Sequence, residues 1–232
     1  MKTLFLCIFF ASLARADFFP ELYSAQIKPT LLRAGDQTSL ALWLSGTASV
    51  LVTRNSDNDI RDNWVNHQKM SADDARVGER YISYGINIGI AGLQLAFDHD
   101  NGFAHTRALA LTGITTVVMK QSFARERPNQ ANHQSFPSGH TSSAFATATS
   151  LSYAYGWKAG VPAFAMAAWT GLSRLADDDH WLSDVVGGAF VGIIWGRAGF
   201  FSVENERETA ANFSFLPYIS SRSSGFSLAL TF

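Results

Sequence analysis

The sequence predicts an all-α protein, a compact bundle of about six helices, with a small β-hairpin at its C-terminal end. Two observations predict the bundle. Apolar runs of helical length recur along the chain, and the connections between the later runs are short and contain Gly, Pro, Asn or Asp. A third observation predicts the hairpin, because apolar residues alternate with small or polar ones in the last eight residues, GFSLALTF.

The helical pattern occurs in six segments that follow one another through most of the chain. A polar stretch after the first of them is predicted to be a loop with a short helix. The hairpin is predicted from NFSFLPYIS and GFSLALTF, with the turn-like SRSSG between them. The predicted helices are Thr38–Val52, Arg76–Phe97, Phe103–Phe123, Ser138–Tyr155, Val161–Leu175 and His180–Phe200.

The first sixteen residues, MKTLFLCIFFASLARA, have the pattern of a secretory signal peptide. Lys2 gives a basic start, Leu4–Leu13 is an apolar run too short to span a bilayer, and ARA is an A-x-A cleavage site. The expected organisation is a signal peptide at 1–16, a helical domain at 17–205 and a C-terminal tail at 206–232.

Composition narrows the location and the class of function. The formal net charge of −1 argues against a general nucleic-acid binder. Cys7 is the only cysteine, so export without disulfides indicates a bacterial periplasm and excludes thiolate chemistry. The mean hydropathy of +0.04 is low for a multi-span membrane protein, and Arg197 interrupts the most apolar run. A soluble or membrane-associated periplasmic protein is favoured over one embedded in the membrane, and both alternatives remain open.

Cationic side chains gather in KQSFARERPNQANHQSFPSGHTSS, which begins at Lys120, although the whole chain is nearly neutral. Lysine offers a compact charge and arginine a planar fork, and both suit the oxygens of a phosphoryl group. Pro128 disfavours a helical Arg127, so the helix carrying Lys120 is expected to end there. Ser138 is expected to be the N-cap of a helix that begins near Gly139, where backbone N–H groups can bind an anion.

A second cluster lies downstream, where Arg174 is followed by His180 and Asp184. His180 and Asp184 are four residues apart and share one face if the segment is helical. The carboxylate can then accept a hydrogen bond from one ring nitrogen and leave the other as a nucleophile. His140 is expected to transfer protons, first to the leaving alkoxide and then from water. This chemistry needs no metal and no cofactor.

These segments resemble the three-part signature of the type-2 phosphatidic acid phosphatase superfamily, K-x6-R-P, P-S-G-H and S-R-x5-H-x3-D. They stand here as KQSFARERP, PSGH and SRLADDDHWLSD. The superfamily includes lipid phosphate phosphatases, class A bacterial acid phosphatases and vanadium haloperoxidases. The resemblance therefore implies a helical bundle of the acid phosphatase/vanadium-dependent haloperoxidase type. It implies phosphate binding by Lys120, Arg127, Ser138, Gly139 and Arg174, with His140 as general acid, His180 as nucleophile and Asp184 as the residue that orients it.

The expected function is a metal-independent phosphatase that hydrolyses phosphomonoesters, or also pyrophosphates, through a phosphohistidine intermediate. Aromatic-rich and Gly-rich helices favour a lipid phosphate as substrate. The alternative is a periplasmic non-specific acid phosphatase acting on soluble phosphomonoesters. A vanadium-dependent haloperoxidase is less favoured because relatives with that activity are much longer, and a non-catalytic envelope protein because no motif position is lost.

Three further features receive structural interpretations. Arg125 and Glu126 are interpreted as a local pair. The run Asp177–Asp179 is expected to face outward and cap the last helix, where acidic residues favour the helix dipole. The segment FDHDNGFAH, which ends at His105, is interpreted as a polar loop between helices rather than a metal site, because Asn-Gly favours a turn.

Overall fold

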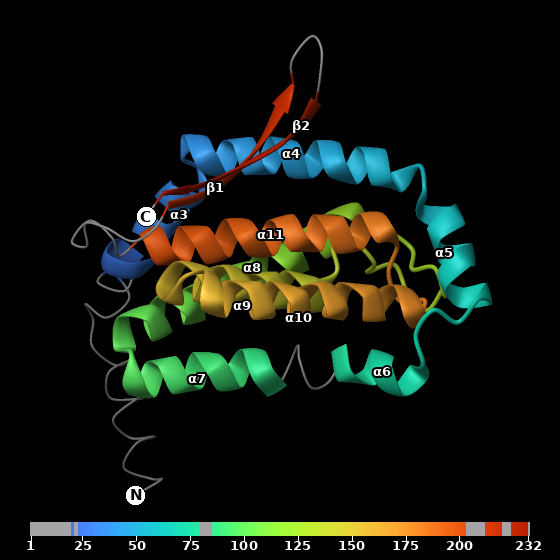
Figure 1. Ribbon diagram of the computed structural model, residues 1–232, viewed down its shortest axis with the longest axis horizontal. Helices are drawn as coiled ribbons and strands as arrows, with labels where there is room; N and C mark the ends of the chain where they lie inside the picture. The colour runs from blue at the N-terminus through green and yellow to red at the C-terminus, as the bar shows by residue number, and fades with distance from the viewer. Residues whose placement is uncertain (1–19, 21–22, 79–84, 203–211, 220–223, 232) are drawn as a thin grey trace, which may run out of the picture.

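The computed structural model describes residues 20, 23–78, 85–202, 212–219 and 224–231. Within these residues the chain forms a helical bundle whose long helices lie side by side (Figure 1). The predicted helical architecture is therefore confirmed. The expected signal peptide at 1–16 lies outside the described residues.

The long helices follow the predicted order. Additional short helices lie before α4 and between α4 and α7. The polar stretch expected to hold a loop and a short helix forms two short helices, α5 and α6. The predicted helix Arg76–Phe97 is helical from Asn87 onward, and 79–84 are outside the description. The elements are η1 (Tyr23–Ile27), α3 (Lys28–Ala34), α4 (Gln37–Arg54), α5 (Asp57–Asn66), α6 (Ala72–Arg76), α7 (Asn87–Phe97), α8 (His99–Phe123), α9 (Gly139–Tyr155), α10 (Trp157–Ala176) and α11 (Leu182–Phe201).

The expected loop between α7 and α8 is wrong, because α8 already begins at His99 and includes the Asn-Gly pair. The backbone N–H of Gly102 donates to the carbonyl oxygen of Asp98 at 2.8 Å, which continues the first turn of the helix. A Cβ at Gly102 would lie 2.7 Å from the carbonyl carbon of Gln94. Glycine is therefore needed here for the close approach of α8 to α7, and not for a turn.

Helix α11 lies at the centre of the bundle, in contact with α3, α4, α8 and α9 (Figure 1). Gly188, Gly192 and Gly196 recur every four residues and form a glycine ridge on its α9 side. A Cβ at Gly188 would lie 2.6 Å from the carbonyl oxygen of Ser138, and one at Gly196 would lie 2.8 Å from that of Ala146. The two helices can approach this closely only because the ridge carries no side chains.

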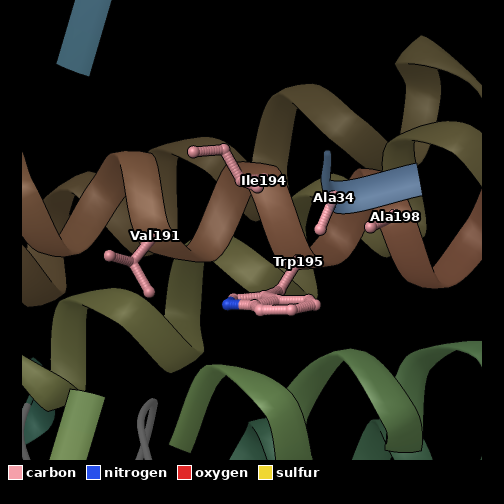
Figure 2. Packing of buried hydrophobic residues seen from close by; sticks show 5 residues of the cluster. All are labelled: Ala34, Val191, Ile194, Trp195 and Ala198. Atoms are coloured by element: carbon pink, nitrogen blue, oxygen red, sulfur yellow. The ribbon is translucent and has the colours of Figure 1, made fainter. Parts of the chain in front are cut away.

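Larger side chains of α11 fill other parts of its surface. Figure 2 shows Val191, Ile194, Trp195 and Ala198 of α11 together with Ala34 of α3, which form a buried hydrophobic cluster. Among the described helices, α11 is the one that is long and apolar enough to cross a membrane, and 56% of that apolar window is buried inside the bundle. Its apolar surface thus contributes mainly to the core.

Successive long helices reverse direction, so that several of their ends meet on one side. The last turns of α8 and α10 lie with the first turns of α9 and α11 at the right-hand end of Figure 1. Helix α5 covers this end and contacts both α10 and α11. The arrangement gathers the segments that carry the three motifs.

Two strands follow the helices, β1 (Asn212–Ile219) and β2 (Ser224–Thr231). They pair antiparallel, with Asn212 opposite Thr231 and Ile219 opposite Ser224. These strands coincide with the two segments of alternating pattern. The expected packing of a hairpin against the bundle stays a prediction, as do the domain boundaries at 205 and 206.

Candidate active site

The side chains expected to form the site come from the helix ends and loops at the α5 end of the bundle. Each motif supplies at least one group from a helix terminus, because the sequence breaks the helices at these points. Lys120 is in the last turn of α8, Arg127 is in the loop after it, Ser138, Gly139 and His140 begin α9, Arg174 is in the last turn of α10, His180 is in the loop before α11, and Asp184 is in the first turn of α11.

Helix α8 ends earlier than Pro128 would require. Ala124 has a left-handed φ of 43° and its N–H donates to the carbonyl oxygen of Lys120, which stops the helix after Phe123. The ammonium group of Lys120 donates to backbone carbonyl oxygens of Gln134 and Ser135 in the following loop. Burial, together with the nearby charge of Arg127, lowers the pKa of Lys120 to about 8. An anion bound beside these two cations would relieve their repulsion.

Helix α9 begins at Gly139 with Ser138 in the N-cap position, as predicted. The hydroxyl of Ser138 accepts a hydrogen bond from Thr141 Oγ1 at 2.9 Å and does not cap the backbone. The N–H of Ser138 donates to the carbonyl oxygen of Asp184 at 3.0 Å, which ties the start of α9 to the start of α11. The first turn of α9 therefore carries N–H groups that face the site end of the bundle and can bind an anion.

His180 and Asp184 are not on one helical face, because α11 begins only at Leu182. They are nevertheless close, with His180 Nδ1 3.7 Å from Asp184 Oδ2, which is longer than a hydrogen bond. Burial lowers the pKa of His180, and the adjacent Asp184 opposes this shift only in part. The imidazole is therefore neutral at neutral pH, as a nucleophile must be.

His140 lies within reach of the charges of the other site residues. Burial is the main cause that lowers its pKa to about 4, and the positive charges of Arg174 and Arg127, with that of His180 when it is protonated, lower it further. His140 is thus neutral in the unliganded protein at neutral pH. A bound phosphate would add negative charge beside the ring and raise its pKa toward the value that a general acid needs.

Arg125 is a residue of the candidate site that the sequence did not reveal, and its interpretation as a local partner of Glu126 is wrong, because it pairs with two distant aspartates. Its guanidinium donates to Asp184 Oδ1 at 2.7 Å and to Asp57 Oδ2 at 2.7 Å. Asp57 comes from α5 and is buried. It also accepts hydrogen bonds from the N–H of Ser183 at 2.9 Å and from its hydroxyl at 2.6 Å.

The second carboxylate oxygen of Asp184 is also held. It accepts from the hydroxyl of Ser135 and from the N–H of Trp181 at 2.9 Å. Asp184 is thus fixed from both sides, by Arg125 on one oxygen and by these two donors on the other, while Asp57 holds Arg125 in place. The carboxylate that faces the His180 ring has a defined position before any substrate binds.

The run of three aspartates does not face outward as a cap, so that expectation is wrong. Asp178 forms two hydrogen bonds of 2.7 Å with Arg61 of α5. Asp177 and Asp179 both form ion pairs with Arg174. Of these pairs, the sequence spacing could have predicted the one between Arg174 and Asp177, because the two residues are three positions apart at a helix end.

Part of the sequence that carries the site also matches known proteins. Residues 102–208 match the family model of the PAP2 superfamily. A segment of 96 residues, 40% of the chain, is 42% identical to the lipid A 1-phosphatase of Porphyromonas gingivalis and covers 22% of it. A segment of 77 residues, 33% of the chain, is 36% identical to the lipid A 4'-phosphatase of Helicobacter pylori and covers 38% of it. The chain thus matches about a fifth and about two fifths of the length of these relatives.

Solved structures show the same fold over a longer part of the chain. The crystal structure of Aquifex aeolicus LpxE superimposes with a TM-score of 0.52 at 23% identity, covering 64% of this chain and 94% of the other. The first transmembrane PAP2-type phosphatidylglycerolphosphate phosphatase from Bacillus subtilis gives a TM-score of 0.56 at 18% identity, covering 73% of this chain and 96% of the other. The resemblance noted in the three motifs is confirmed, because the region that carries them matches the family model of the PAP2 superfamily.

Proposed function

We propose that the chain is a metal-independent phosphatase that hydrolyses a lipid phosphomonoester through a phosphohistidine at His180. The observation that carries the proposal is the surroundings of this buried ring. Its Nδ1 faces a fixed carboxylate, Asp184, while Lys120 and Arg127 lie near enough for their charges to act on it. A neutral imidazole beside two cations suits attack on a phosphorus atom whose oxygens those cations bind.

In the first step, Nε2 of His180 attacks phosphorus, the phosphorus–oxygen bond to the alkoxide breaks, and His140 donates its proton to that alkoxide. Asp184 accepts from the Nδ1–H group and stabilises the positive charge that develops on the ring. Negative charge on the three equatorial oxygens is stabilised by donors from separate helices. These donors are Lys120, Arg127, Arg174, and the backbone at Ser138 and Gly139.

In the second step, His140 is neutral and removes a proton from a water molecule. The resulting hydroxide attacks the phosphohistidine, the phosphorus–nitrogen bond breaks, and inorganic phosphate and neutral His180 are released. His140 regains the proton that the next leaving group requires. The cycle therefore balances with water as the only other reactant.

A lipid substrate is supported by an apolar groove beside the site. The groove has a volume of about 480 Å³ and lies between α4, α8 and α11. Arg125, which contacts Asp184, lines one part of it, and Phe136, which precedes the PSGH motif, lines another. An acyl chain in the groove would thus start next to the phosphate-binding groups. The remaining lining residues are Trp43, Gly46, Thr47, Val50, Leu51, Arg54, Met119, Phe123, Gly187, Phe190 and Val191.

The outer surface supports membrane association, because several large apolar side chains are exposed on different helices. Leu44 of α4 is 74% exposed, Phe97 of α7 is 85% exposed and Ile114 of α8 is 60% exposed. Large apolar side chains exposed in this way are unfavourable in water and favourable against lipid. The names of the two curated relatives, both lipid A phosphatases, make a phosphorylated glycolipid the first substrate to test. Export to the periplasm stays a prediction.

The test is phosphate release in EDTA from lipid A, phosphatidate and p-nitrophenyl phosphate, using protein purified in detergent. We expect faster release from a lipid than from p-nitrophenyl phosphate. A radiolabelled phosphoenzyme that is stable in base and labile in acid should be trapped in the wild type and absent in His180→Ala. His140→Ala should form it slowly and hydrolyse it slowly.

The matched control is His67→Ala, which removes an exposed histidine at the end of α5. It should retain both the phosphoenzyme and the rate of release. Loss of activity in EDTA, or an undiminished phosphoenzyme in His180→Ala, would rule out the proposed mechanism. Equal rates with lipid and soluble substrates would instead favour a non-specific acid phosphatase.

A further inference from the structure

The two arginines proposed to bind phosphate already share an anion that belongs to the protein itself. The carboxylate of Asp179 lies between them, with Oδ1 3.3 Å from Arg127 Nη1 and Oδ2 3.3 Å from Arg174 Nη1. Each of its oxygens thus faces a different guanidinium. Asn129 Nδ2 donates to Oδ1 at 2.9 Å and fixes the carboxylate in this position.

Burial explains why an internal anion is needed. The side chain of Arg174 is fully buried, whereas that of Asp179 is 30% exposed. A buried guanidinium without a counter-ion would strongly destabilise the fold. Asp177, which also pairs with Arg174 and is 28% exposed, contributes to the same neutralisation. A phosphate oxygen that is to reach Arg174 must therefore displace a carboxylate that covers it.

We propose that Asp179 is an internal occupant of the phosphate site, which competes with the substrate phosphate for Arg127 and Arg174. This inference rests on the proposed function, since it takes these arginines to be phosphate ligands. A phosphate has enough oxygens to bind both guanidinium groups at once and can replace the bridging carboxylate on both. Asp179 thereby raises the concentration of substrate that is needed to fill the site.

The experiment measures the binding of inorganic phosphate by calorimetry and its inhibition of phosphate release from the lipid substrate. Asp179→Asn keeps the size of the side chain and removes its charge. We expect this variant to bind phosphate about tenfold more tightly than the wild type, since charge-assisted hydrogen bonds no longer have to be broken. Its KM should fall by a similar factor.

Asp178→Asn is the matched control. It makes the same change of charge in the neighbouring residue, whose partner is Arg61 and not a proposed phosphate ligand. Asparagine also tolerates the positive φ of 57° at this position. This variant should bind phosphate like the wild type. Asp179→Ser provides a second test if Asp179→Asn does not fold, as judged by circular dichroism.

Unchanged or weaker phosphate binding in both Asp179 variants would overturn the inference, because weaker binding would mean that the carboxylate positions the arginines. A tightening that Asp178→Asn shares would overturn it as well, since it would reflect only the net charge. Binding needs no turnover, so the two proposals can fail separately. Tighter phosphate binding in a protein that hydrolyses nothing would refute the proposed function alone.

Discussion

The two ends of the bundle each bury a histidine, but they surround it differently. At the end away from the motifs, Nδ1 of His105 lies 2.7 Å from Gln94 Oε1 and its Nε2 lies 2.9 Å from Thr147 Oγ1. At the motif end, Nδ1 of His180 lies 3.7 Å from a carboxylate oxygen of Asp184. Both rings are buried. The His105 ring has two short contacts to neutral groups, whereas the His180 ring has one longer contact, to the carboxylate of Asp184.

The neutral contacts belong to a longer network. Gln94 Nε2 donates to the hydroxyl of Tyr155 at 3.1 Å, and this hydroxyl donates to Asp98 Oδ2 at 2.9 Å. The network runs from the buried ring to the exposed Tyr155, and its short hydrogen bonds satisfy the buried polar groups and support the fold. His180, in contrast, lies beside the carboxylate of Asp184 and within range of the charges of Lys120 and Arg127. Under the proposed mechanism, burial alone does not distinguish the nucleophilic histidine from the structural one, whereas the charge of the neighbouring side chains does.

The largest expected effect separates the two histidines by activity. His180→Ala should lower kcat for phosphate release by at least about a thousandfold, because it removes the proposed nucleophile. His105→Ala should keep most of the activity of the folded protein but lower its melting temperature, since it leaves a cavity and breaks two contacts. Activity assays and thermal unfolding of both variants check this. A large loss of kcat in stable His105→Ala would abolish the distinction.

The next effect concerns the residues that hold Asp184. Arg125→Ala should lower kcat about 10- to 100-fold with little change in KM, because the carboxylate loses its support while phosphate binding remains. Asp57→Asn should act in the same direction but less strongly. Arg125→Lys should recover part of the loss, as it restores one donor. An effect confined to KM would show that Arg125 contacts the substrate.

A smaller effect should be visible in the titration of His140. Its pKa of about 4 is lowered by burial and by the neighbouring Arg174 and His180. Saturation with vanadate, an anion shaped like the transition state, should raise this pKa by about one unit or more. The protonated state then extends to higher pH in the complex than in the free protein. Nuclear magnetic resonance of labelled histidines measures it, and His105 should show no corresponding change.

The smallest expected effect is on stability alone. Thr147→Val removes the partner of His105 Nε2 and keeps the shape of the side chain. It should reduce the free energy of unfolding by about 1–3 kcal/mol, because a buried ring nitrogen loses its hydrogen bond. Phosphate release should be unaffected. Chemical denaturation measures the change, and a simultaneous loss of activity would mean that the two ends are coupled.

The sequence predicts the helices and the motif residues well, because both depend on local pattern. The apolar runs indicate where the long helices lie, and the breaks between these runs place the motif cations and histidines near helix ends. Ser138 illustrates this, because its position at the start of α9 is predicted from adjacent residues, although its hydroxyl accepts from Thr141 and does not cap the backbone.

What could not be predicted depends on contacts between distant segments. Asp57 lies on a short polar helix, and nothing in its neighbourhood indicates that it binds Arg125 and Ser183 far along the chain. The pairing of Asp178 with Arg61 has the same origin. The error at Asn101–Gly102 has another cause. Glycine serves turns and close helix contacts alike, and only the packed structure distinguishes these uses.

The glycine ridge of α11 has a consequence for the chemistry at its far end. Because the backbones of α9 and α11 are in direct contact along the ridge, no flexible side chain between them can adjust when one helix shifts. The two helices therefore move together as a rigid unit. The starts of these helices flank the two histidines assigned to catalysis, whose separation is therefore set by contacts several turns away. A larger residue at position 196 should therefore displace His140 relative to His180 and slow the proposed proton transfer, although Gly196 does not contact the substrate.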